Sequence, residues 1–114
     1  MLNLYKYYKD PTQLPGYQER TKIIPDLAYN HALKVIKGRW PEAEPYIMRD
    51  PITAYRYAMH LIQERWPEGE PSIMKDPYYA YMYAKFVIKG RWPEAEPYIK
   101  QDPTYWAYYM RDIE

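Results

Sequence analysis

Paired glutamates are the first residues whose type and spacing suggest chemistry. Each pair follows a Trp-Pro dipeptide and has one residue between its members; the pairs are Glu42 and Glu44, Glu68 and Glu70, and Glu94 and Glu96. Two neighbouring carboxyl groups can divide the roles of general acid and general base. An active site is normally single and asymmetric, however, whereas these pairs recur in three copies. We therefore interpret them as helix-start residues, whose negative charge opposes the positive end of a helix, and expect no catalytic residue.

Histidine, serine and cysteine supply no further catalytic or metal-binding motif. His31 and His60 do not form the His-Glu-x-x-His spacing of a zinc site. Ser72 is the only serine and has no base partner in the sequence. The chain has no cysteine, which excludes disulfides, thiolate ligands and cysteine nucleophiles. The sequence therefore predicts a protein that is not an enzyme and that binds no metal and no cofactor.

Three Arg-Trp dipeptides are the second candidate for chemistry, because Trp rings can stack on bases while Arg binds the phosphates of a nucleic acid. Nucleic-acid-binding surfaces are typically clusters of positive charge. Here 16 basic side chains are balanced by 15 acidic ones, and two Glu follow each Arg-Trp. We therefore favour packing of each Trp between helices, with the Arg paired to Glu. Nucleic-acid contact through Arg39, Arg65 and Arg91 is the alternative.

These motifs recur because the chain is a tandem repeat with a period of 26 residues. Trp40, Trp66 and Trp92 mark the period, and the stretch VIKGRWPEAEPYI at 35–47 returns unchanged at 87–99. The middle copy reads LIQERWPEGEPSI and keeps the same frame. We divide the chain into a degenerate first copy and N-terminal cap at 1–24, full copies at 25–50, 51–76 and 77–102, and a C-terminal half copy at 103–114.

Each full copy is predicted to form two helices, of which the first begins at or near an X-Pro step. Asp50-Pro51 is typical, because Asp accepts hydrogen bonds from free N–H groups and Pro suits the first helical position. Apolar residues in steps of three and four then form one stripe. The stripe comprises Ala28, Ala32, Val35 and Ile36, and their equivalents Ala54, Ala58, Leu61, Ile62, Ala80, Ala84, Val87 and Ile88. Gly38 and Gly90 are predicted to end the helix as left-handed caps, and Glu64 at the same position predicts a strained or differently shaped turn.

A second, shorter helix is predicted to begin at Pro41 and at its equivalents Pro67 and Pro93. A further proline four residues later removes one backbone hydrogen bond and should bend or tighten the first turn. One such helix pair cannot bury its apolar face alone, so neighbouring repeats must stack on one another. The sequence therefore predicts an all-α fold, a short α-solenoid of two-helix repeats.

The two ends of the chain differ from the repeats between them. Trp106 and Met110 replace the small alanines of the stripe, and these larger side chains should cover the last repeat. Residues 12–25 are predicted to form a loop or irregular turn, preceded by an apolar cluster over the first repeat formed by Leu2, Leu4, Tyr5, Tyr7 and Tyr8. Self-association through the aromatic C-terminal end is a weaker possibility, using Tyr105, Trp106, Tyr108 and Tyr109.

Composition also bears on location. No apolar run approaches the roughly 18 residues of a membrane span, and no charged and then apolar leader opens the chain. We therefore expect a cytoplasmic protein with no membrane partner.

The phrase GRWPEAEPYI, followed by Lys or Arg, an Asp-Pro pair and a helix rich in Tyr and Ala, is distinctive. It resembles the tandem RWPEAE-type helical repeats of uncharacterised proteins from tailed phages and related elements. The match covers residues 25–102, with departures in the middle copy at Glu64, Gly69 and Ser72 that concern its loop geometry. The resemblance implies a helical repeat protein in a phage setting, within the cytoplasm of a host cell, and brings no catalytic residue.

Positions opposite the alanine stripe vary while the frame stays constant. In successive copies they are Asn30 and Lys34, Arg56 and His60, and Met82 and Phe86. Repeat proteins can place partner specificity on such a variable surface. We therefore predict a non-enzymatic protein–protein interaction module, which in a phage would bind and modulate a host or defence protein through Arg56, His60, Tyr79, Met82 and Phe86. Divergence of an unconstrained solvent-facing surface, with Phe86 covered by the half copy, is the alternative explanation.

Overall fold

The computed structural model describes residues 10–113, and every regular element in this range is helical. In chain order the elements are η1 (Pro11–Gln13), α2 (Tyr17–Thr21), α3 (Pro25–His31), η2 (Ala32–Ile36), η3 (Pro41–Ala43), α4 (Glu44–Ile47), α5 (Pro51–Tyr57), η4 (Ala58–Ile62), α6 (Glu70–Ile73), α7 (Pro77–Tyr83), η5 (Ala84–Ile88), η6 (Pro93–Ala95), α8 (Glu96–Ile99) and α9 (Pro103–Asp112). Here η marks a 3₁₀ or π segment. The predicted all-α solenoid is confirmed.

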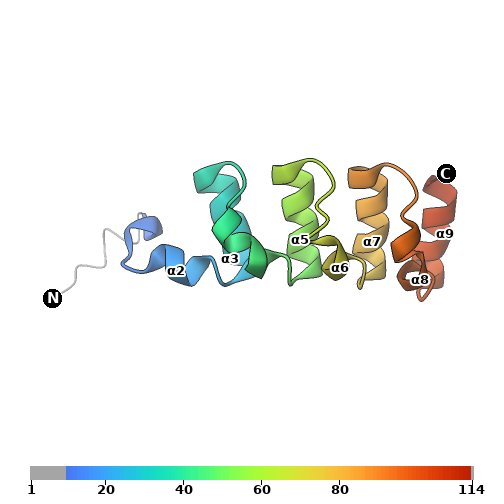
Figure 1. Ribbon diagram of the computed structural model, residues 1–114, viewed down its shortest axis with the longest axis horizontal. Coiled ribbons are helices and arrows are strands. Elements are labelled where there is room, and N and C mark those ends of the chain that lie inside the picture. Colours follow the sequence, from blue (N-terminus) through green and yellow to red (C-terminus); the bar gives the residue numbers. More distant parts are fainter. Residues whose placement is uncertain (1–9, 114) are drawn as a thin grey trace.

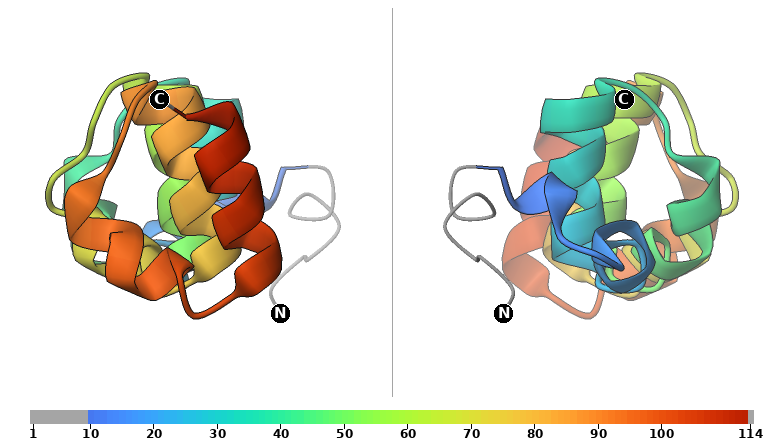
Figure 2. Two further views of the ribbon diagram at one scale, coloured as in Figure 1. Left: turned by 90° about the vertical axis from the view of Figure 1, so that its right-hand side faces the viewer. Right: turned by 90° about the vertical axis from the view of Figure 1, so that its left-hand side faces the viewer.

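The repeats form an elongated stack of 59 × 22 × 21 Å. Helices α3, α5, α7 and α9 stand side by side in one row (Figure 1), and each contacts the next. Viewed along the long axis, the short helices α4, α6 and α8 form a second layer beside this row (Figure 2). The core lies between the two layers and between successive repeats.

The predicted starts of the first helices are correct. The Asp50 carboxylate accepts a hydrogen bond from the Thr53 backbone N–H at 3.0 Å, and the Asp76 carboxylate accepts one from the Tyr78 backbone N–H at 3.0 Å. Pro51 and Pro77 occupy the first helical positions. In α3 the capping position is Ile24, whose side chain makes no capping hydrogen bond.

The alanine stripe is buried as predicted, but the end of the stripe is not buried in the first full copy. All six alanines have no exposed surface; they are Ala28, Ala32, Ala54, Ala58, Ala80 and Ala84. Val35 and Ile36 are 51% and 41% exposed, contrary to the prediction. In a later copy, Val87 packs in a groove beside Met59 of the preceding repeat. Val35 instead lines a groove together with Thr12, Tyr17 and His31.

Each first helix ends in one π-helical turn, and this changes the position of its cap. The Lys37 backbone N–H donates to the Ala32 carbonyl at 2.6 Å, and the Lys89 N–H donates to the Ala84 carbonyl at 2.7 Å. The left-handed residues are therefore Lys37, Gln63 and Lys89, with φ of 61°, 62° and 62°. The wider turn reverses the chain one residue before the expected glycine. The prediction of left-handed caps at Gly38 and Gly90 is wrong.

Glu64 occupies the same position as these glycines without the predicted strain. Its repeat equivalents Gly38 and Gly90 do not have positive φ, and a Cβ at either would meet no atom within 4 Å. The preceding Gln63 takes the left-handed conformation, just as Lys37 and Lys89 do. The middle turn therefore has the same shape as the other two.

The short second helices begin with a tight turn, as the extra proline predicts. Pro41–Ala43 and Pro93–Ala95 are 3₁₀ turns that lead into α4 and α8. In the middle copy, residues 67–69 form a turn with the same hydrogen bond: the Gly69 N–H donates to the Trp66 carbonyl at 2.9 Å, as the Ala43 N–H does to the Trp40 carbonyl at 3.0 Å. A Cβ on Gly69 would lie 2.5 Å from Cε3 of the Trp66 ring. Glycine therefore allows Trp66 to pack directly on this turn.

The two ends are closed differently. Trp106 stacks on Tyr109 with ring centroids 5.3 Å apart and planes 17° apart, and Tyr109 is fully buried. Residues 12–25, expected to be a loop, contain helix α2. The predicted cluster of Leu2, Leu4, Tyr5, Tyr7 and Tyr8 lies outside the described residues. None of the helices within residues 10–113 is long and apolar enough to cross a membrane.

Replacing Trp66 with alanine should cost about 3–5 kcal/mol in the free energy of unfolding, the usual loss on emptying a buried large ring. Urea unfolding followed by circular dichroism measures this cost. Trp106→Ala is the matched control, because Trp106 is only partly buried at the end of the stack, and its loss should be smaller. A loss below about 1 kcal/mol for Trp66→Ala would contradict the packing described above.

Candidate functional site

A cluster of Arg, Glu and Tyr holds each repeat to the next. In the middle cluster, Arg65 Nε and Nη2 donate to the two carboxylate oxygens of Glu70, at 2.9 Å each. The Tyr83 hydroxyl donates to Glu70 Oε2 at 2.7 Å and accepts the Trp66 backbone N–H at 2.7 Å. Because Tyr83 belongs to the following repeat, the cluster joins two repeats. The equivalent clusters are Arg39, Glu44 and Tyr57, and Arg91, Glu96 and Tyr109.

Electrostatics keep this cluster in one protonation state. Burial raises the pKa of Glu70, but the hydrogen bonds from Arg65 and Tyr83 outweigh it and hold the pKa below its usual value. Burial also raises the pKa of the Tyr83 hydroxyl. Glu70 therefore stays ionised and Tyr83 stays neutral near neutral pH. The second glutamate of each pair is more than a helix-start residue, since it accepts hydrogen bonds from two elements.

The structure confirms that the Trp rings pack between helices and that each adjacent Arg pairs with Glu. Trp40, Trp66 and Trp92 are 7%, 1% and 0% exposed, so none presents a face on which a base could stack. The guanidinium groups of Arg39, Arg65 and Arg91 are half exposed, and each forms a salt bridge with a glutamate. Nucleic-acid contact through these arginines stays a prediction, and in this structure it lacks the stacking surface that suggested it.

The predicted partner-binding residues lie on two neighbouring first helices. Arg56 and His60 are exposed on α5 and η4, while Tyr79 and Met82 on α7 are partly buried against the core. Tyr79 packs against Tyr55 of the preceding repeat, with ring centroids 5.6 Å apart. Among residues 10–113, the Arg56 and His60 side chains form no hydrogen bond or ion pair. The five residues thus lie on two successive first helices, with Met82 and Phe86 one repeat after Arg56 and His60.

Phe86 is the most exposed apolar residue of this set. Its side chain is 41% exposed, so the terminal half copy does not cover it. It lies in a groove of about 350 Å³ between η4 and η5, which we call the Phe86 groove. The groove is lined by Met59, Gln63, Glu64, Arg65, Phe86, Val87 and Lys89.

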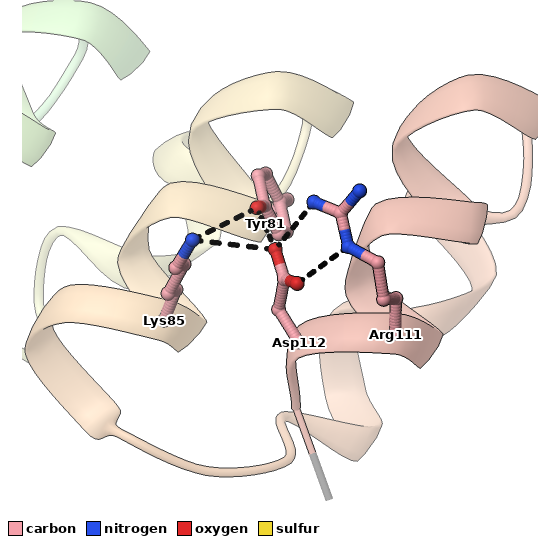
Figure 3. Close-up of polar contacts among 4 residues, drawn as sticks. All are labelled: Tyr81, Lys85, Arg111 and Asp112. Carbon is pink, nitrogen blue, oxygen red and sulfur yellow. Dashed lines mark hydrogen bonds and ion pairs between the residues drawn. The ribbon is translucent and has the colours of Figure 1, made fainter.

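A charged cluster at the C-terminal end was not predicted from the sequence (Figure 3). Asp112 on α9 accepts hydrogen bonds from the Tyr81 hydroxyl, from Lys85 Nζ at 3.2 Å and from Arg111 Nε at 2.7 Å. The hydrogen bonds from Arg111 and Tyr81 hold the pKa of Asp112 well below its usual value. Because Tyr81 and Lys85 belong to the preceding repeat, the cluster ties α9 to its neighbour. One sequence signal for this cluster was available: in an alignment of the repeats, Asp112 occupies the variable position that Phe86 holds one repeat earlier.

A second groove runs beside this cluster, and we call it the Asp112 groove. Its volume is about 340 Å³, and it is lined by Lys85, Lys89, Gly90, Arg111, Asp112 and Ile113. Five of these residues lie one repeat after residues of the Phe86 groove, namely Lys85 after Met59, Lys89 after Gln63, Gly90 after Glu64, Asp112 after Phe86 and Ile113 after Val87. The two grooves are therefore the same feature of the fold with different side chains.

Comparison with known proteins gives no match to a family model, to a curated protein or to a solved structure. The resemblance to tailed-phage repeat proteins stays an expectation from the sequence. Across residues 10–113, no three His, Cys, Asp or Glu side chains come together in a group that could hold a metal ion.

Replacing Tyr83 with phenylalanine should lower the free energy of unfolding by about 1–3 kcal/mol, because the buried Trp66 N–H loses its acceptor. Tyr55→Phe is the matched control, since the Tyr55 hydroxyl donates only to Met59 Sδ among the described atoms and its ring is also buried. Urea denaturation of both variants gives the comparison. Equal losses in the two variants would show that the Tyr83 hydroxyl does not hold the repeats together.

Acid should weaken the stack through the same clusters. Folding lowers the pKa values of Glu44 and Glu70 below the usual 4.5, so their contribution to stability is complete above that value and is lost as the pH falls through the folded-state pKa. The free energy of unfolding should therefore fall as the pH is lowered through and below 4.5. Glu70→Gln should flatten this dependence, whereas Glu68→Gln, at an exposed neighbouring position, should leave it unchanged. An unaltered slope for Glu70→Gln would contradict the assignment.

Proposed function

We propose that the protein is a non-enzymatic interaction module that binds a protein partner on the face formed by Arg56, His60, Tyr79, Met82 and Phe86. The observation that carries this proposal is the exposed Phe86 ring beside a groove of about 350 Å³. Aromatic residues, Phe among them, are enriched at protein–protein interfaces, and binding hot spots cluster where such side chains meet well-packed pockets. Lys85 Nζ also lies 5.2 Å from the centroid of the Phe86 ring, within the range of a cation–π contact.

Two further features support binding on this face. Arg56 and His60 extend it with exposed polar groups, which form no ion pairs within the described residues, so they are available to a polar rim around the aromatic centre. The Arg, Glu and Tyr clusters fix the helices on which all five residues lie. Such a rigid frame lowers the entropy cost of binding.

The setting of this function follows from the resemblance alone. If the chain comes from a phage, its partner is a host or defence protein in the host cytoplasm, whose activity it modulates. The module itself needs no catalytic group for this role.

Replacing both Met82 and Phe86 with lysine should abolish capture of a partner that the unaltered protein retains from a lysate and that mass spectrometry identifies. Val35→Lys with Ile36→Lys is the matched control, because these side chains are also exposed and apolar but lie two repeats away, and it should keep the partner. Circular dichroism checks that both variants fold. Arg56→Glu with His60→Glu alters exposed positions only and should also weaken capture. Unchanged capture in both face variants would contradict the proposal.

The C-terminal end supports a second, weaker candidate, association of two copies. Tyr108 and Met110 are both exposed there, beside the half-buried Tyr105 and Trp106, although Tyr109 is fully buried. Light scattering at several protein concentrations measures the mass. A mass that does not rise with concentration would exclude this association.

A further inference from the structure

The Phe86 groove and the Asp112 groove are neighbours that share one lining residue. Lys89 lines both of them, and each groove lies between the C-terminal turns of two successive first helices. Neighbouring packed helices are about 8–10 Å apart, and an extended peptide advances about 3.3 Å per residue. A peptide that crosses from one groove to the next therefore needs about three residues for the step.

The side chains that line the two grooves call for different ligand groups. Met59, Phe86 and Val87 supply the apolar part of the first groove, beside the polar side chains of Gln63, Glu64, Arg65 and Lys89. Among the described residues that line it, the second groove has three cations, Lys85, Lys89 and Arg111, and one carboxylate, that of Asp112. Lys85 and Arg111 already pair with Asp112, whereas Lys89 pairs with no described residue. This excess of positive charge favours an acidic group.

We infer that the two grooves form one track for an extended segment of the partner protein, with an apolar side chain in the Phe86 groove and an acidic side chain about three residues away in the Asp112 groove. This inference rests on the proposed function and specifies the chemistry of the partner. A peptide fits the track better than a nucleic acid does, because a phosphate backbone would bring negative charge past Glu64 as well as past Lys89. Met59, Phe86 and Val87 in the first groove also offer a phosphate group no hydrogen-bond donor.

The test uses amidated peptides of about ten residues, each with Phe and Glu three positions apart in a Gly-Ser background, made in both orders. Titration into the ¹⁵N-labelled full chain is followed by NMR. The backbone amides of Gln63, Lys89 and Ile113 should shift with at least one of the two peptides. Replacing Phe with Ala, or Glu with Lys, in the peptide should weaken its binding by about threefold or more.

The Lys89→Glu variant tests directly whether the Asp112 groove prefers an acidic side chain. It should weaken binding of the Phe and Glu peptide by about fivefold and should strengthen binding of the peptide that carries Lys in place of Glu. Lys37→Glu is the matched control, because Lys37 has the same left-handed conformation two repeats away and the substitution changes the net charge equally. This control should retain the original preference for Glu.

Three outcomes would overturn the inference. They are an absence of shifts at the groove amides with either peptide, equal binding of the Glu and Lys peptides, and shifts that inorganic phosphate alone reproduces while the Phe to Ala change has no effect. Partner capture by the Met82 and Phe86 variant is measured separately. If that variant loses the partner while Lys89→Glu retains it in full, the peptide track is wrong and the proposed interaction function stands.

Discussion

The structure depends on one tyrosine hydroxyl at each junction between repeats. The backbone of Trp66 lies in the link between two helices, so no helix supplies an acceptor for its buried N–H group, and buried N–H groups are rarely left unpaired. The Tyr83 hydroxyl from the next repeat accepts this hydrogen bond and donates its own proton to Glu70. Arg65 then balances the charge of Glu70. Satisfying one backbone group thus fixes the position of the next repeat.

The junction before the first full copy is built from different residues. His31 stands one repeat before Tyr57, and Leu14 stands one repeat before Trp40. The His31 ring is buried and lies 3.2 Å from the Tyr17 hydroxyl through Nδ1, and burial lowers its pKa. Residues 10–24 therefore pack on the stack through different contacts, and Val35 remains exposed beside them.

Much of the fold could be predicted because its signals are local or periodic. The Asp-Pro starts, the alanine stripe and the 26-residue frame are read directly from neighbouring residues and from spacing. The π turns could not be predicted, because Gly38 suggests a left-handed residue, whereas the hydrogen bond from Lys37 to Ala32 depends on how the helix end packs.

The junctions and the grooves also could not be predicted from neighbouring residues alone. Tyr57 follows Trp40 by 17 positions and belongs to another repeat, although its recurrence as Tyr83 and Tyr109 was visible. Phe86 was found because it varies where the frame is constant. The cluster around Asp112 was missed because its partners Tyr81 and Lys85 are 31 and 27 positions away.

Because the three junctions are built from equivalent residues, a whole repeat can be added or removed while the contacts at each remaining junction are kept. Removing residues 51–76 as a block would place Trp40 and Glu44 opposite Tyr83, whose repeat equivalent Tyr57 already bonds to both. Loss of one 26-residue repeat would therefore leave each remaining junction with a complete set of donors and acceptors. Deletion between the identical stretches 35–47 and 87–99 would remove two units at once and bring the exposed Val35 and Ile36 of η2 beside α9.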